Sequence, residues 1–147
     1  MRINVFLLAC AFATCAMASD IQEEMPVRAH IPDTFYHRPS VEMRCFTSKA
    51  VEQQIKEMHS RLLAVSPKLW QMFQNCFPNT LDTTVFPEGE RTFVITGDID
   101  AMWLRDSGAQ VWTYIQYIKE DPELARLIRG VILKQLEFIC LDPYANA

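Results

Sequence analysis

One short run of the sequence, TGDIDAMWLRDSGAQVW at residues 96–112, gathers most of the residues that could do chemistry. Burying carboxylates and a guanidinium is costly unless they meet partners or a ligand. Asp98 and Asp100 can accept hydrogen bonds from hydroxyl groups. Arg105 donates hydrogen bonds in a planar fork, and Trp103 offers a flat apolar face. Together they suit a sugar ring, which has hydroxyls at its rim and C–H groups on its faces. We therefore predict a carbohydrate-binding site here.

A purely structural interpretation of the same run stays open. Asp106 would then cap the helix that follows it. Arg105 would form an ion pair with Asp98 or Asp100, and the two tryptophans of the run would belong to the core. Sequence alone does not separate this clamp from a binding site.

A metal site is a third interpretation of the run. Asp98-x-Asp100 is similar to the DxD pattern of metal-dependent glycosyltransferases, and carboxylate oxygens suit Mn²⁺ or Mg²⁺. The pattern is short and common by chance, and Arg105 close by would oppose a cation. The sequence has no HExxH zinc motif, no GxSxG and no phosphate-binding glycine loop. We therefore expect no metal and no cofactor.

The run must be positioned by the elements around it, and two helices are predicted before it. Ser48 is a suitable N-cap for a helix over residues 48–65, where apolar residues recur at helical spacing. Ser66 can cap a second helix, Pro67 suits its first position, and Pro78 ends it.

Two short strands are predicted between these helices and the run. NTLDTTVF (79–86) and RTFVIT (91–96) are rich in threonine, valine and phenylalanine, residues that favour strands. The tripeptide Pro87-Glu88-Gly89 suits a turn between them.

Two further helices are predicted after the strands. The first begins near Asp106 or Ser107 and continues to about Ile118, and the second opens at Asp121-Pro122. The second has a wide apolar stripe, which indicates a helix packed on more than one neighbour. The stripe comprises Leu124, Leu127, Ile128, Val131, Ile132, Leu136 and Ile139. These helices predict an all-α fold whose apolar faces are too broad to close a core among four helices.

Composition narrows the class of protein. The chain has 147 residues, is 50% hydrophobic and carries a net charge of −4. A negative net charge argues against non-specific nucleic-acid binding. Cys76 and Cys140 fall in apolar helical patterns, so we interpret them as small core residues.

The amino-terminal residues are predicted to be a targeting segment. Residues 1–18 have the apolar stretch and small-x-small ending of a signal peptide cleaved before Ser19, which predicts export to the periplasm, cell surface or exterior. A lipoprotein signal ending before Cys10 is the alternative. The apolar stretch is too short to span a membrane. A proline-rich extended lead-in follows at 19–44, and the folded domain is predicted over 45–147.

Three motifs resemble one known family. NTLDTTV (79–85), TGDIDAMWLRDS (96–107) and DPYANA (142–147), in this order, are similar to glycoside hydrolase family 125, the metal-independent exo-α-mannosidases. The resemblance implies an (α/α)6 barrel, of which this chain would be the N-terminal third, as a fragment. It implies inverting hydrolysis of a terminal α-1,6-linked mannose, with α-mannoside glycans as partners and no metal or cofactor.

The resemblance also implies roles for the residues of the run. Arg105 and Asp106 are expected to bind the hydroxyls of the terminal mannose. Asp98, Asp100 and Trp103 are expected to contact the sugar or support the residues that do. Tyr144 and Asn146 are weaker candidates for the same pocket. The acid and base of the family are expected downstream of Ala147, so no catalytic residue is assigned and the fragment alone is expected to be inactive.

Two other functions stay open at this point. One is a non-catalytic sugar-binding helical module that is complete as it stands. The other is a metal-dependent glycosyltransferase that uses Asp98 and Asp100.

Overall fold

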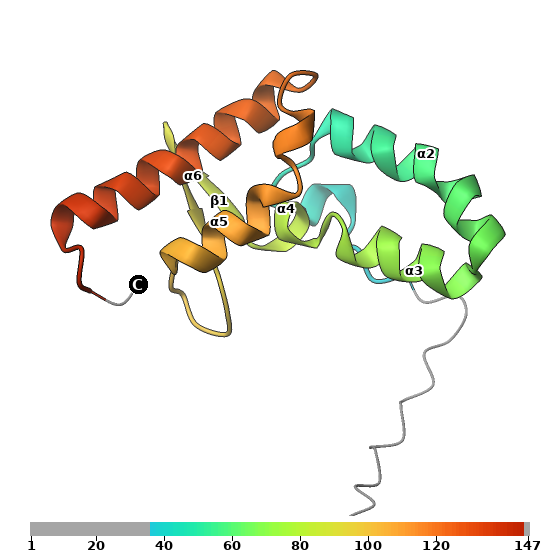
Figure 1. Ribbon diagram of the computed structural model, residues 1–147, viewed down its shortest axis with the longest axis horizontal. Coiled ribbons are helices and arrows are strands. Elements are labelled where there is room, and N and C mark those ends of the chain that lie inside the picture. Colours follow the sequence, from blue (N-terminus) through green and yellow to red (C-terminus); the bar gives the residue numbers. More distant parts are fainter. Residues whose placement is uncertain (1–35, 146–147) are drawn as a thin grey trace, which may run out of the picture. The chain divides into compact units, whose positions relative to one another are not determined.

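The computed structural model describes residues 36–145, and most of them lie in helices (Figure 1). The predicted signal peptide, the alternative at Cys10, residues 19–35 of the predicted lead-in, and Asn146 lie outside the described residues. In chain order the elements are η1 (Val41–Met43), α2 (Lys49–Val65), α3 (Pro67–Cys76), α4 (Asn79–Thr83), β1 (Val85–Glu88), β2 (Arg91–Val94), α5 (Leu104–Trp112), η2 (Ile115–Tyr117) and α6 (Pro122–Leu141). No helix among residues 36–145 has both the length and the apolar character to cross a bilayer.

The helical hairpin α2–α3 begins and ends where the sequence predicts. The Ser48 side chain accepts a hydrogen bond from the backbone N–H of Val51, and Pro67 occupies the first turn of α3. Ser66 joins the two helices, although its side chain makes no capping hydrogen bond. The two helices lie side by side in Figure 1, and the His59 and Trp70 rings form a T-shaped pair with 4.7 Å between ring centroids.

The predicted strand at 79–86 is wrong over most of its length. Residues 79–83 form the short helix α4, in which the Thr83 and Thr84 hydroxyls donate to backbone carbonyls four residues earlier, at 2.7 and 3.0 Å. Such local hydrogen bonds offer threonine an alternative to a strand ladder. The all-α prediction is also too simple, since β1 and β2 form a two-stranded antiparallel sheet.

The turn of this hairpin begins two residues later than predicted. Glu88 pairs with Arg91, so the connection is Gly89-Glu90, while Pro87 belongs to β1. Gly89 has φ of 65°, a left-handed conformation that glycine adopts without steric cost. Positive φ at the first central residue alone is the pattern of a type II′ turn, whose twist suits a hairpin.

The hairpin packs closely against α6 at Gly130. A Cβ atom at Gly130 would lie 2.4 Å from Thr92 Oγ1 and 2.9 Å from Thr92 N, so only glycine allows this approach. Around this contact Val85, Val94 and Val131 are buried. The β-hairpin is therefore held under the first half of α6, and it sets where the loop after β2 begins.

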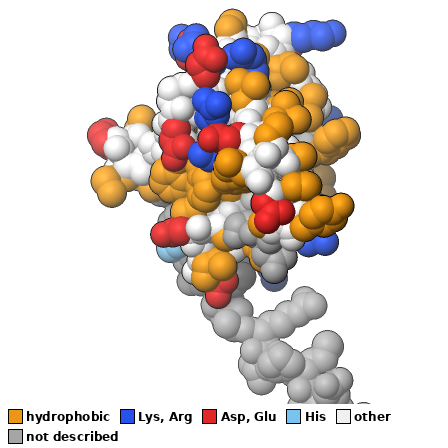
Figure 2. Space-filling model, turned by 90° about the vertical axis from the view of Figure 1, so that its left-hand side faces the viewer, with side chains coloured by type: hydrophobic (Ala, Val, Ile, Leu, Met, Phe, Trp, Pro, Cys, Tyr) orange, Lys and Arg blue, Asp and Glu red, His pale blue; other side chains and the backbone are white. Residues whose placement is uncertain are grey.

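The wide apolar stripe of α6 is only half covered. Its first four members, from Leu124 to Val131, are buried, whereas Ile132, Leu136 and Ile139 are 52%, 51% and 43% exposed. Figure 2 shows apolar side chains gathered beside charged ones on the side where α6 ends. The sequence predicts that α6 packs on more than one neighbour. Among the described residues, only the first half of the helix is packed in this way.

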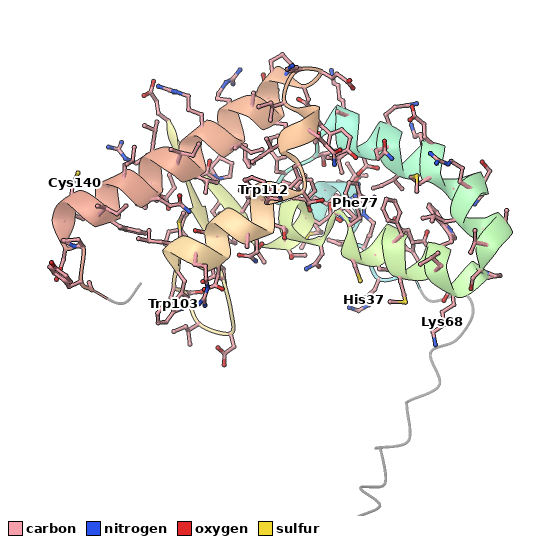
Figure 3. The ribbon with its side chains drawn as sticks, in the orientation of Figure 1. His37, Lys68, Phe77, Trp103, Trp112 and Cys140 are labelled. Carbon is pink, nitrogen blue, oxygen red and sulfur yellow. The ribbon has the colours of Figure 1, made fainter. Side chains whose placement is uncertain are left out.

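Three other predictions about the helices are corrected. Cys76 and Cys140 are exposed and not core residues, and Cys140 projects from the outer side of α6 (Figure 3). The helix predicted to reach Ile118 ends at Trp112, and a turn of 3₁₀-helix follows it. Tyr114 still lies in the core at 1% exposure, and its buried hydroxyl donates to the Phe77 carbonyl oxygen.

Four buried or half-buried charges tie the segment before α2 to α4. Arg38 Nε and Nη2 donate to the two carboxylate oxygens of Asp82 at 2.7 and 3.0 Å, and Arg38 also donates to Glu52. Arg44 Nη1 donates to Glu52 at 3.2 Å. Burial works to lower the pKa of Arg38, but the hydrogen bonds that it donates to Asp82 and Glu52, with the charges of these carboxylates, outweigh burial and raise the pKa. Two cations and two anions thus form a balanced cluster.

The N-termini of α2 and α6 meet through their capping residues. Asp121 Oδ1 accepts from the backbone N–H of Leu124, as the sequence predicts, and Oδ2 accepts from the Ser48 hydroxyl at 2.6 Å. Burial of Asp121 works to raise its pKa, but the hydrogen bonds from Ser48, Leu124 and Ala50 outweigh burial and hold the pKa below its ordinary value of 3.8. The ionised carboxylate therefore stabilises the fold.

This contact predicts a pH-dependent contribution to stability. Because the folded-state pKa is lowered, the contribution is complete above the unfolded pKa of 3.8 and is lost as the pH falls through the folded value. We expect Asp121→Asn to lower the free energy of unfolding by about 1 kcal/mol at neutral pH, and the difference from wild type to shrink below about pH 4. Urea unfolding of both proteins across this range measures it. A difference that is independent of pH would contradict the assignment.

Candidate functional site

The loop that leads from β2 into α5 is closed by Thr96. Its backbone N–H donates to the Ala101 carbonyl oxygen at 3.0 Å, and its hydroxyl donates to the same oxygen at 2.9 Å. The hydroxyl also accepts from the backbone N–H of Trp103 at 3.1 Å. Next to this closure Met102 is 1% exposed, with its sulfur 3.3 Å from the backbone nitrogen of Val94. The loop is therefore anchored at both ends, and residues 97–100 project from it.

Helix α5 begins at Leu104, earlier than the predicted start at Asp106 or Ser107. Trp103 occupies the N-cap position with an extended backbone, and its indole, which is a donor only, makes no capping hydrogen bond. The backbone N–H of Trp103 donates to the Thr96 hydroxyl. Asp106 is consequently not the cap but lies in the first turn, where a carboxylate interacts favourably with the helix dipole.

Arg105 and Asp106 form an exposed ion pair. Arg105 Nη2 lies 3.2 Å from Asp106 Oδ2, with side-chain exposures of 88% and 37%. The clamp between Arg105 and Asp98 or Asp100 is therefore wrong. The two tryptophans are not core residues either, because Trp103 is 41% and Trp112 is 74% exposed. They lie at opposite ends of α5 in Figure 3, so only one of them can belong to a site at the helix start.

A pocket of about 460 Å³ lies between the start of α5 and the end of α6. We call it the α5–α6 pocket. Its lining residues are Met102, Trp103, Leu104, Arg105, Asp106, Phe138, Leu141, Asp142, Pro143 and Ala145. A charged pair and a second carboxylate stand among apolar and aromatic side chains, which is the mixture that orients a small polar ligand. Three of the five predicted site residues, Trp103, Arg105 and Asp106, meet in this pocket.

The other two predicted site residues do not line the pocket. Asp98 and Asp100 are exposed in the projecting part of the loop, and neither accepts a hydrogen bond from any residue in 36–145. In that same part of the chain no three His, Cys, Asp or Glu side chains come together as metal ligands. The described geometry therefore offers no support for a two-aspartate metal site.

One wall of the pocket was not predicted from the sequence. Phe138, Leu141 and Asp142 close it from α6 and its end. The DPYANA motif was the available signal, although we had assigned the weaker roles to other members of it. Tyr144 is 95% exposed and does not line the pocket. Asp142 Oδ1 instead accepts from the Tyr144 backbone N–H at 2.9 Å, which fixes the turn after α6.

The pocket thus unites two of the three motifs from the sequence, and comparison with known proteins decides the family. The model of the metal-independent alpha-mannosidases, GH125, matches residues 66–147. The chain belongs to this family. The match includes both walls of the α5–α6 pocket.

Two relatives of this GH125 chain give the extent of the likeness. The Meiotically up-regulated gene 157 protein of Schizosaccharomyces pombe is 42% identical over an alignment of 130 residues that covers 82% of this chain and 25% of that protein. A Streptococcus pneumoniae metal-independent alpha mannosidase, solved in a non-productive substrate complex with alpha-1,6-mannobiose, is 39% identical with a TM-score of 0.62. That match covers 69% of this chain and 24% of the solved chain. The chain therefore spans about a quarter of the length of each relative.

Proposed function

We propose that the whole protein is an exo-acting α-mannosidase that removes a terminal α-1,6-linked mannose by metal-independent inverting hydrolysis. The observation that carries the proposal is the α5–α6 pocket, where two family motifs from separate parts of the chain meet. The Streptococcus pneumoniae neighbour, which is described with alpha-1,6-mannobiose, supports the choice of substrate.

In this proposal the chain supplies the grip on the terminal sugar. Arg105 donates to two neighbouring hydroxyls through its planar fork, and Asp106 accepts from a third. Trp103 and Phe138 contact the C–H face of the ring. The ion pair orients both charged groups before the sugar arrives, so less ordering is needed on binding. Asp98 and Asp100, which project outside the pocket, keep a supporting role only.

The proposal assigns the chemistry to residues beyond this chain. Inverting hydrolysis needs a carboxylic acid that protonates the leaving oxygen and a carboxylate about 6.5–9.5 Å away that activates water on the opposite face. We assign neither group to residues 1–147. The chain would bind the sugar, and the 147 residues alone would be inactive.

The same proposal includes the (α/α)6 barrel as the complete fold and export through residues 1–18. The half-covered stripe of α6 supports the barrel, because Ile132, Leu136 and Ile139 form an exposed apolar row that a further helix would cover. The relatives, about four times as long, have the length for such helices.

The test is hydrolysis by the full-length protein. We expect mannose release from α-1,6-mannobiose, unchanged by EDTA, with the β-anomer appearing first by proton NMR because the mechanism inverts. Binding of the disaccharide without release would favour the sugar-binding module. Activity that EDTA abolishes would favour a metal-dependent enzyme.

A further inference from the structure

The pocket residues Arg105 and Asp106 stand on a helix end that lacks a cap of its own. The first N–H groups of a helix have no intrahelical partner, and a side-chain cap is the usual means of satisfying one of them. Trp103 at the N-cap makes no such hydrogen bond. Since the two charged side chains pair only with each other among the described residues, their placement depends on how firmly this first turn is held.

One side chain from the facing helix α6 holds that turn. Gln135 of α6 directs its amide nitrogen at α5, where Nε2 donates to the Leu104 carbonyl oxygen at 2.9 Å and to the Ser107 hydroxyl oxygen at 2.8 Å. An amide NH₂ has two hydrogens, so both are used. The Ser107 hydroxyl in turn donates to the Leu104 carbonyl oxygen at 3.2 Å. These three groups form a closed triangle of hydrogen bonds.

The triangle brackets the residues that would bind sugar. Leu104 and Ser107 lie on either side of Arg105 and Asp106 in the sequence, and Phe138, one turn after Gln135 on α6, lines the other side of the pocket. Ser107 is 0% exposed, and its hydrogen bonds with Gln135 and Leu104 explain how a polar residue is accommodated at this buried position. Gln135 therefore links the two walls of the α5–α6 pocket without lining it.

The crossing of the two helices leaves room for this link. A Cβ atom at Gly108 would lie 3.6 Å from Gln135 Nε2, an ordinary contact distance, so even an alanine at this position would leave room for the amide. Binding sites tolerate displacements of only about 0.5 Å in the groups that grip a ligand. A hydrogen-bonded link of this kind is suited to keep the walls within that range.

We propose that Gln135 is a positioning residue for the α5–α6 pocket, acting through Leu104 and Ser107 on Arg105 and Asp106. The proposal rests on the proposed function, since it concerns the sugar that this pocket would bind. It adds a residue that touches neither the sugar nor the reacting atoms.

The test uses the full-length protein with Gln135→Leu, which keeps the approximate side-chain size and removes both donors. Gln116→Leu is the matched control, because Gln116 also donates to a backbone carbonyl, that of Thr113 at 3.0 Å, but is exposed and away from the pocket. We expect the dissociation constant of mannose, measured by calorimetry, to rise about tenfold in Gln135→Leu, since two hydrogen bonds are lost, and less than about twofold in the control. Hydrogen exchange should become faster at residues 104–107.

A third variant keeps the test informative if Gln135→Leu does not fold. Ser107→Ala removes one of the two acceptors and should raise the dissociation constant by a smaller factor. In the double variant, Gln135→Leu should raise the dissociation constant by a smaller factor than it does alone, because the hydrogen bond between Gln135 and Ser107 is already absent. Faster exchange in the variants with an unchanged affinity would reduce Gln135 to a structural role and overturn the proposal. If wild-type protein shows no affinity for mannose, the proposed function fails and this proposal falls with it.

Discussion

Arg105→Ala in the full-length protein is expected to lower kcat/KM for α-1,6-mannobiose by about 100-fold, the loss that follows from one or two charge-assisted hydrogen bonds. The reason lies in the exposure and pairing of the guanidinium. It is 88% exposed, makes its only described ion pair with Asp106, and lines the α5–α6 pocket, so several of its donors are available to a ligand. Arg105→Lys should recover part of the loss, since an ammonium retains the charge but not the planar fork.

The control for this variant is a second exposed arginine pair. Arg126 lies 2.8 Å from Glu123, is 65% exposed and belongs to the start of α6, outside the pocket. We expect Arg126→Ala to leave kcat/KM unchanged. The free energies of unfolding of both variants should lie within about 0.5 kcal/mol of wild type, because exposed ion pairs contribute little to stability. Equal losses of activity in the two variants would remove Arg105 from the binding site.

The helix caps were predictable because a cap depends on residues next to it in the sequence. Ser48 and Asp121 each precede an apolar helical pattern, and both side chains cap as expected. The contact between them was not predictable, since it joins residues 73 positions apart. The same limit applies to α4, where strand-forming residue types were present and tertiary packing of Leu81 and Asp82 favoured a helix.

The candidate site was predictable in its residue types and only partly in its geometry. The sequence placed five polar and aromatic residues within one run, and the structure brings three of them into one pocket. Asp98 and Asp100 lie outside the pocket, in the part of the loop that projects beyond its closure at Thr96. The hydrogen-bond pattern of that closure has no signature in the sequence. The wall formed by Phe138 and Asp142 depends on how α6 crosses α5, which only packing decides.

The largest effect on stability is expected at Asp82, which lies in the stretch predicted as a strand and found as the helix α4. Its side chain is 2% exposed and accepts two hydrogen bonds from Arg38, while Arg44 Nε lies 3.7 Å away. Asp82→Leu would leave two buried arginines with Glu52 as their single anion. Removing one partner of a buried ion pair costs about 3–5 kcal/mol, so we expect a loss of that size in the free energy of unfolding.

The sharper expectation is the order of the single and double variants. Arg38→Met combined with Asp82→Leu removes one cation and one anion together and leaves Arg44 paired with Glu52 at 3.2 Å. Because replacing both members of a buried pair by apolar groups is often neutral, the double variant should be more stable than Asp82→Leu alone. Asp98→Asn, at an exposed carboxylate with no described partner, serves as the control and should change the stability by less than about 0.5 kcal/mol. Denaturant unfolding of the four proteins gives the order directly. A double variant less stable than Asp82→Leu would mean that Arg38 stabilises the fold mainly through its contact with Glu52 and not through its pairing with Asp82.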